Sequence, residues 1–219
     1  MNRTMTPPKT ASSRTEATRA RLLEAARDVI RAKGYAATTV DDICAAAGVT
    51  KGAFFHHFPS KERLGLDAIE AFNDMASRLF AAPFAALPDP RDRLLGYLDV
   101  RIALLNREIP LFTCLLGTLV QEIHATHPAL RDACEAGMAS HIAALTRDIA
   151  AAKALHAPDA AWSAESLGYF MQSVLQGAFI FAKAKQDAAV VAESLTHLKL
   201  YLVSLFGAPA PETKDTPRP

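Results

Sequence analysis

The stretch from Thr39 to Leu64 most constrains the fold, because its pattern predicts two short helices joined by a glycine turn. Thr39 is a predicted N-cap residue, and the two acidic residues that follow suit the first turn of a helix. Gly48 predicts the end of that helix, because glycine adopts a positive φ without steric cost. Thr50 then caps a second helix, which ends before Pro59. This arrangement is typical of a helix-turn-helix, whose second helix enters the major groove of DNA.

Helical periodicity continues on both sides of this stretch, and the sequence carries no strand pattern and no internal repeat. An amphipathic helix is expected over residues 15–33, and Ser60 begins a further helix that runs to about residue 81. Prolines then interrupt the chain, and the remaining pattern predicts five helices, over 92–107, 111–126, 128–156, 163–185 and 188–206. We therefore expect an all-α protein with an N-terminal three-helix helix-turn-helix DNA-binding domain and a C-terminal helical ligand-binding and dimerisation domain.

Composition divides the chain into four segments. Residues 1–14 are rich in Thr, Ser, Pro and basic groups and are expected to form a disordered arm. Residues 15–64 are expected to be the helix-turn-helix domain, and residues 65–206 the helical effector-binding and dimerisation domain. Residues 207–219 are expected to be a disordered tail because prolines and polar groups dominate them.

Charge is distributed unevenly along the chain. Residues 1–65 hold eleven Lys and Arg against six Asp and Glu, whereas residues 66–219 hold thirteen against seventeen. A basic module joined to a mildly acidic one is typical of a nucleic-acid-binding protein with a second function. Three widely spaced cysteines argue for a reducing compartment. The sequence predicts no secretory signal and no apolar run approaching the roughly 20 residues of a membrane span, so a cytoplasmic, nucleoid-associated protein is expected.

The helix-turn-helix stretch resembles the DNA-binding domain of the tetracycline-repressor (TetR) family of bacterial transcription regulators. About fifty residues match in order without a gap, among them Gly34-Tyr35, Thr38-Thr39-Val40, Ala46-Ala47-Gly48-Val49, Lys51-Gly52 and His57-Phe58-Pro59-Ser60-Lys61-Glu62. Two positions depart from the family, which usually has Ala where Cys44 stands and Tyr where Phe55 stands. The resemblance implies a homodimeric, ligand-responsive regulator, most often a repressor, that pairs through its last two helices.

A small set of residues is expected to meet DNA. Lys51 begins the second helix, where lysine can donate to guanine O6 and N7. Gly52 lets the backbone approach a phosphate. Phe55 lacks the hydroxyl that the family uses on the DNA backbone, so that contact is expected to be absent or to pass to His56. The resemblance places seven positions near DNA, although His57 can equally be a packing residue: Thr39, Thr50, Lys51, Phe55, His56, His57 and Lys61.

The helices between 91 and 185 are expected to enclose an apolar effector pocket with a few directed polar groups. Apolar and aromatic side chains at helical spacing are also consistent with a plain core, so the polar members are the better indicators. The segment Cys114–Leu119 with Glu122 resembles a C-terminal subtype of the family in which the matching cysteine of some members senses electrophiles; a buried, inert thiol is the alternative. The predicted lining is Phe112, Cys114, Leu115, Met138, His141, Trp162, Tyr169, Phe170, Gln172, Ser173 and Gln176.

The last two helices are unusually apolar for the end of a small all-α chain, which favours pairing with a second copy; the alternative is that this surface is all intramolecular core. No complete metal-ligand set, phosphate-binding loop or nucleophile motif is present, so no metal, cofactor or enzymatic activity is expected. The expected partners are double-stranded operator DNA, a small hydrophobic or electrophilic effector and a second copy, but no membrane. The alternatives are a helical small-molecule-binding protein without DNA binding and a small α-helical enzyme that uses Cys114.

Overall fold

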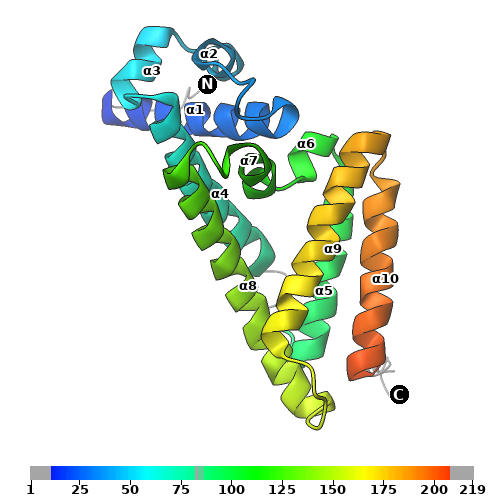
Figure 1. Ribbon diagram of the computed structural model, residues 1–219. Helices are drawn as coiled ribbons and strands as arrows, with labels where there is room; N and C mark the ends of the chain where they lie inside the picture. Colours follow the sequence, from blue (N-terminus) through cyan, green and yellow to red (C-terminus); the bar gives the residue numbers. More distant parts are fainter. Residues whose placement is uncertain (1–10, 82–83, 85, 208–219) are drawn as a thin grey trace, which may run out of the picture. The chain divides into compact units, whose positions relative to one another are not determined.

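The computed structural model describes residues 11–81, 84 and 86–207 (Figure 1). Helices make up 81% of the protein, and the described residues contain no strand, which confirms the all-α fold class. The expected disordered arm falls, up to residue 10, outside the described residues, as does the expected tail from residue 208. The first helix, α1 (Ala11–Lys33), begins before the expected start at residue 15.

The chain folds into two compact units. The first, here called the head unit, comprises residues up to Met75 together with Thr113–Gly137. The second, here called the bundle unit, comprises Ala76–Phe112 and the residues from Met138 onward. Helices α4 (Lys61–Ala81) and α8 (Pro128–His156) each contribute residues to both units.

The head unit holds the predicted helix-turn-helix. Its helices α2 (Val40–Ala47) and α3 (Lys51–His57) follow α1, and the bounds match the sequence prediction. Thr39 and Asp42 form a reciprocal capping box at the start of α2. Gly48 ends α2 in the left-handed region at φ 62°, a conformation that side chains with a Cβ rarely adopt. These local signals fix the turn independently of distant contacts.

The core of the head unit is made of large apolar side chains from several helices. Phe54 of α3 and Phe58, the C-cap of that helix, are almost completely buried, as are Leu22 and Ile30 of α1 and Ile43 of α2. The start of α4 and the helix α7 (Leu115–Ile123) complete this unit with residues that include Leu64, Ile69, Leu115 and Leu119. The side chain of Phe54 therefore anchors α3 in the core, and the opposite face of α3 is exposed to solvent.

The bundle unit contains α5 (Pro90–Ala103), the 3₁₀ turn η1 (Leu104–Asn106), α6 (Ile109–Phe112), α9 (Ala164–Lys185) and α10 (Ala189–Phe206). Helices α9 and α10 lie side by side (Figure 1). Each buries one stripe at helical spacing, formed by Leu167, Met171, Leu175 and Phe179 on α9 and by Val191, Leu195, Leu198 and Leu202 on α10. Ser163 caps α9 by accepting a hydrogen bond from the Ser166 amide at 2.9 Å.

The predicted single helix over 111–126 is wrong, because the chain breaks between α6 and α7. Cys114 is extended there and caps α7, its Sγ accepting from the Gly117 amide at 3.4 Å. The Thr113 carbonyl accepts instead from Arg31 Nη1 at 3.2 Å. Similarly, the helix expected over 92–107 ends at Ala103 and is followed by the 3₁₀ turn. The apolar periodicity of the sequence does not reveal these interruptions. The break between α6 and α7 depends on the guanidinium of Arg31, which is distant in sequence, and on the thiol of Cys114 as a cap.

Helix α10 is long and apolar enough to cross a membrane by length and composition, which the sequence analysis did not anticipate. Only 28% of the relevant window is buried, and no other helix of the described residues meets the same test. A core helix of a water-soluble protein passes the test equally well. The buried stripe of α10 packs against α9, and α10 also contacts α5, whereas Leu200 and Tyr201 are exposed.

Candidate nucleic-acid interface and effector site

Helix α3 separates its residues into a buried face and an exposed face. Phe54 and Phe58 point into the core, whereas Lys51, Phe55 and His56 are exposed. Phe55 is 52% exposed, and its ring meets Phe54 edge-on with the ring centroids 5.1 Å apart. Since Lys51 and Phe55 are four residues apart, they lie on one face of the helix. That face offers a cation, an aromatic ring and an imidazole to a partner.

The two cap threonines of the predicted DNA set are engaged in the fold. The Thr39 hydroxyl donates to Asp42 Oδ2 at 2.6 Å and accepts from the Asp42 amide at 3.1 Å. Hydrogen bonds from Lys33 and then Thr39 hold the pKa of Asp42 well below its usual range. Thr50 accepts from the Ala53 amide at 3.2 Å. Both hydroxyls thus have a capping role, and their contact with DNA stays a prediction.

Lys61 also has a role within the head unit. Its Nζ donates to the carbonyls of Tyr35 at 3.0 Å and Thr38 at 2.9 Å, and it lies 4.1 Å from the centroid of the Tyr35 ring. Burial lowers the pKa of this ammonium, and Glu122 partly opposes that effect. Lys61 therefore ties the start of α4 to the turn between α1 and α2. A phosphate contact by the same ammonium stays a prediction.

His57 and Gly52 complete the predicted set. His57 is half-buried and packs against Phe58 with the ring centroids 6.3 Å apart. Burial, then His56 and Arg19, lowers the pKa of His57, which favours the neutral imidazole. Gly52 is exposed, and a Cβ added there would meet only the Thr50 hydroxyl at 3.8 Å. The packing role for His57, which the sequence left open, is supported by these contacts.

The sequence analysis missed a contact between α7 and the turn that follows α1. Gly34 has φ 87°, and a Cβ added there would lie 1.9 Å from Glu122 Oε1. The other carboxylate oxygen of Glu122 accepts from the Ala36 amide at 3.0 Å. Next to it, the rings of Tyr35 and His127 meet edge-on at 5.2 Å. A carboxylate therefore occupies the space that any side chain at position 34 would need.

In the bundle unit, His141 and Gln172 gather around Tyr97, a buried residue that the sequence analysis did not select. The Tyr97 hydroxyl accepts from Gln172 Nε2 at 3.0 Å and from Arg101 Nε at 3.1 Å. Its own hydrogen is then directed to His141 Nε2, 3.0 Å away. Burial and then Arg101 lower the pKa of His141 to about 4, so this imidazole is neutral. The i,i+4 spacing of Tyr97 and Arg101 on one predicted helix was the available signal.

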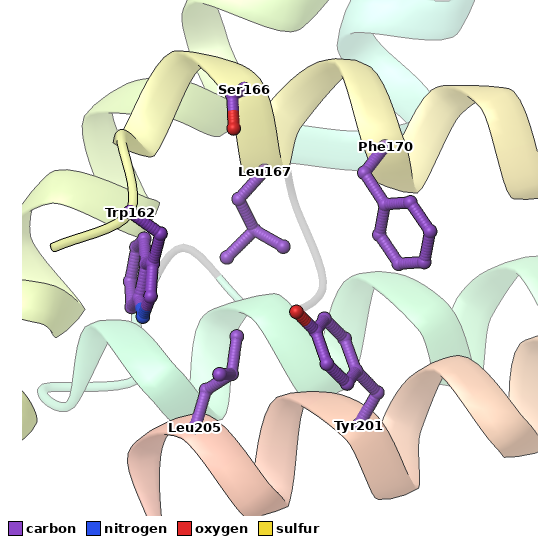
Figure 2. A pocket seen from close by; sticks show the side chains of 6 residues that line it. All are labelled: Trp162, Ser166, Leu167, Phe170, Tyr201 and Leu205. Carbon is purple, nitrogen blue, oxygen red and sulfur yellow. The ribbon is translucent and has the colours of Figure 1, made fainter. Parts of the chain in front are cut away.

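Two aromatic members of the predicted lining, Trp162 and Phe170, border a hollow of about 230 Å³ between α9 and α10. Figure 2 shows Phe170 and Tyr201 at one end of this hollow and Trp162 at the other. The rings of Phe170 and Tyr201 meet edge-on with centroids 5.4 Å apart. The remaining lining of the hollow is Ser166, Leu167 and Leu205.

The other predicted lining residues do not join either group. Tyr169 and Ser173 are exposed, Met138 and Gln176 are half-buried, and Phe112 packs on Phe179 with ring centroids 6.1 Å apart. Cys114 and Leu115 belong to the head unit, where Leu115 is fully buried.

All three cysteines are free thiols, and Cys44 and Cys134 are buried. Burial raises the pKa of Cys134 to about 12, which makes that thiol unreactive. Cys114 is half-buried and acts as the cap of α7 described above. Within the described ranges, no three His, Cys, Asp or Glu side chains gather into a possible metal site.

Two family profiles match this chain. One is described as bacterial regulatory proteins, tetR family, and matches residues 22–68. The other is described as tetracyclin repressor-like, C-terminal domain, and matches residues 90–198. The two profiles together cover well over half of the chain.

Similar proteins include the HTH-type transcriptional regulator CymR of Pseudomonas putida, 36% identical over 91 residues, which are 42% of this chain and 45% of CymR. The HTH-type transcriptional repressor DhaR of Mycobacterium sp. (strain GP1) is 32% identical over 52% of this chain and 56% of DhaR. The chain thus spans about half the length of these curated relatives. A TetR transcriptional regulator from Chloroflexus aurantiacus has a similar structure, with TM-score 0.77 and 27% identity over 87% of this chain and 96% of that one. The chain belongs to the TetR family of bacterial regulatory proteins.

Proposed function

We propose that this protein is a ligand-responsive, DNA-binding transcriptional regulator. It acts as a repressor, which leaves its operator when a small hydrophobic or electrophilic effector binds. The observation that carries the proposal is the exposed row of Lys51, Phe55 and His56 on α3, held in place by buried Phe54 and Phe58. A short helix anchored on one face and exposed on the other suits insertion into the major groove. DNA binding is assigned to residues 15–64, and effector binding and dimerisation to residues 65–206.

Lys51 is the residue proposed to contact bases or phosphates most directly. It is exposed at the start of α3, and its ammonium forms a solvent-exposed ion pair with Asp41 that water weakens. Thr39, Thr50, Gly52, Phe55, His56, His57 and Lys61 are proposed to lie near the DNA. Because the cap threonines and Lys61 already have partners within the fold, their contribution is expected to be smaller than that of Lys51.

The proposed dimer forms through α9 and α10. Six large apolar side chains on these two helices are exposed: Tyr169, Phe170, Ile180, Phe181, Leu200 and Tyr201. An apolar face of this extent is typical of a protein interface. The hollow in Figure 2 lies between the same two helices and can accept an apolar side chain of the partner. A two-fold pair would present two α3 helices to major grooves roughly 34–36 Å apart.

The proposed effector site lies around Tyr97 in the bundle unit, with His141, Gln172 and Arg101 as its polar end. These polar groups converge on one buried hydroxyl, and a few directed polar groups of this kind are typical of a small-molecule site. An effector that binds better to the DNA-incompetent form would shift the protein off its operator. Cys114 is the proposed target only if the effector is electrophilic. TetR-family regulators are soluble cytoplasmic proteins and generally not enzymes. For this protein, a non-enzymatic role and association with the nucleoid are proposed.

Binding to the DNA upstream of its own gene tests the proposal. Fluorescence anisotropy with that duplex is expected to give salt-dependent binding of a dimer, and Lys51→Ala is expected to weaken it at least tenfold and to flatten its salt dependence. Lys185→Ala, at the exposed end of α9, is the matched charge control. A monomer that binds no duplex at low ionic strength would favour the alternative of a helical small-molecule-binding protein.

A further inference from the structure

Asp41 and Lys51 form an ion pair between the first turn of α2 and the first residue of α3. Lys51 Nζ lies 3.1 Å from Asp41 Oδ1 and 3.2 Å from Oδ2, so the ammonium sits across both carboxylate oxygens. The Lys51 side chain is 57% exposed and the Asp41 side chain 71%. A pair this exposed contributes little to stability because water screens it. Asp41 also lies in the first turn of α2, where the helix dipole favours a carboxylate, but that role does not require the carboxylate to face Lys51.

The neighbouring acid, Asp42, has a different task. It closes the capping box with Thr39 and pairs with Lys33 at 2.6 Å, and all of these contacts lie within the fold. Asp41 instead directs its carboxylate toward α3, the helix proposed to enter the major groove. The two adjacent carboxylates thus have different roles: Asp42 caps α2, whereas Asp41 lies beside Lys51, the lysine proposed to contact DNA.

A carboxylate at a DNA interface is tolerated in few places, because the phosphates repel it. In the major groove, the hydrogen-bond donors of the bases are the amino groups of cytosine and adenine, and Asp accepts from cytosine N4. Lysine pairs best with guanine O6 and N7. A G·C base pair offers both sets side by side, because guanine O6 and cytosine N4 are hydrogen-bonded to each other.

We propose that Asp41 and Lys51 together recognise one G·C base pair in each operator half-site. Lys51 donates to guanine, and Asp41 accepts from the N4 amino group of the paired cytosine. Asp41 is then a specificity-determining residue, whose effect is on which sequence is bound more than on how tightly DNA is held. This inference rests on the proposed function, since it requires α3 to enter the major groove.

The test starts with wild-type protein and a randomised duplex library, which together define the half-site. Each base pair of the selected half-site is then exchanged singly, and affinities are measured by anisotropy. Wild type is expected to lose roughly tenfold in affinity or more at one G·C position. Asp41→Ala is expected to bind all duplexes more tightly and to reduce the penalty at that position to about threefold or less, because only the guanine contact remains. Asp41→Asn is expected to favour T·A there, since asparagine pairs with adenine N6 and N7.

Glu24→Ala is the matched control, because Glu24 is 67% exposed and pairs with Arg27 at 3.2 Å on α1. This variant removes the same charge from the head unit without touching α2 or α3. If Asp41→Ala and Glu24→Ala behave alike and every base-pair penalty stays as in wild type, the inference is overturned and Asp41 merely lowers the net charge. If wild type selects no sequence from the library, the proposed function itself fails and takes the inference with it. Thermal unfolding of each variant verifies that the capping box, and hence α2, is intact.

Discussion

The head unit and the bundle unit expose very different surfaces. Among the described residues, Phe55 is the one large apolar side chain that the head unit leaves exposed, whereas the bundle unit exposes many, including Phe181 and Leu200. The head unit closes its core within one copy of the chain, through capped helices packed on Phe54 and Phe58. The bundle unit retains an apolar face that a second copy would cover. The head unit is thus self-sufficient, whereas the bundle unit is the region proposed to pair with a second copy.

The largest expected effect tests the self-sufficient head. Phe54→Ala is expected to lower the free energy of unfolding of the head by about 3–5 kcal/mol, because it leaves a cavity in a fully closed core. Phe55→Ala, one residue further on, removes a ring of the same size that is 52% exposed, and is expected to change stability much less. Urea denaturation followed by circular dichroism compares the two. Equal losses would mean that the two faces of α3 are not distinct.

The polar interior of the bundle unit predicts a specific pH dependence. The folded-state pKa of His141 is about 4, against an ordinary value of 6.5, because burial and Arg101 disfavour its imidazolium. Below pH 6.5 the unfolded chain takes up a proton that the folded protein does not, so stability falls as pH decreases from 6.5 toward 4. The contribution lost over that window is roughly 3 kcal/mol. His141→Gln should reduce the dependence of the free energy of unfolding on pH, measured by denaturation at a series of pH values. If the variant and the wild type gave parallel curves, His141 would not be the cause.

The apolar face of the bundle unit is tested by placing a charge on it. Phe181→Asp is expected to weaken the proposed dimer by about 2 kcal/mol or more, because the substitution buries an unpaired carboxylate in the interface. Leu155→Asp on α8 is the matched control, since Leu155 is 63% exposed and Phe181 is 61% exposed. Analytical ultracentrifugation over a concentration series reports both variants. A dimer that is unaffected by Phe181→Asp would mean that α9 is not at the interface.

The smallest expected effect concerns the turn after α1. Gly34→Ala is expected to cost about 1–2 kcal/mol from its positive φ, with a further loss from the collision of the new Cβ with Glu122. In a Glu122→Ala background the loss from the collision should disappear, while the cost of the positive φ remains. A double-mutant cycle by thermal denaturation separates the two contributions. An identical cost in both backgrounds would show that the carboxylate moves aside freely.

The same contrast explains how much could be predicted from the sequence. The bounds of α2 and α3 were predicted well because Thr39, Gly48 and Thr50 determine them locally. The break before α7 was missed because it depends on Arg31, which is distant in sequence from Thr113. In the bundle unit, His141 and Gln172 were selected as polar residues among apolar ones, but Tyr97, to which both are hydrogen-bonded, was not. A buried tyrosine whose hydroxyl is hydrogen-bonded occupies the same positions in the helical pattern as an aromatic residue that only packs in the core, so the sequence does not distinguish the two.

The contact between Gly34 and Glu122 limits how this chain can be recombined with its relatives. One residue inserted between Cys114 and Glu122 would turn α7 by roughly 100° and carry the carboxylate away from the glycine. A chimera that transplants only the residues up to Met75 would also lose that carboxylate, although Thr113–Gly137 packs within the same unit. Engineered hybrids of this protein should therefore move both segments together, as one discontinuous module.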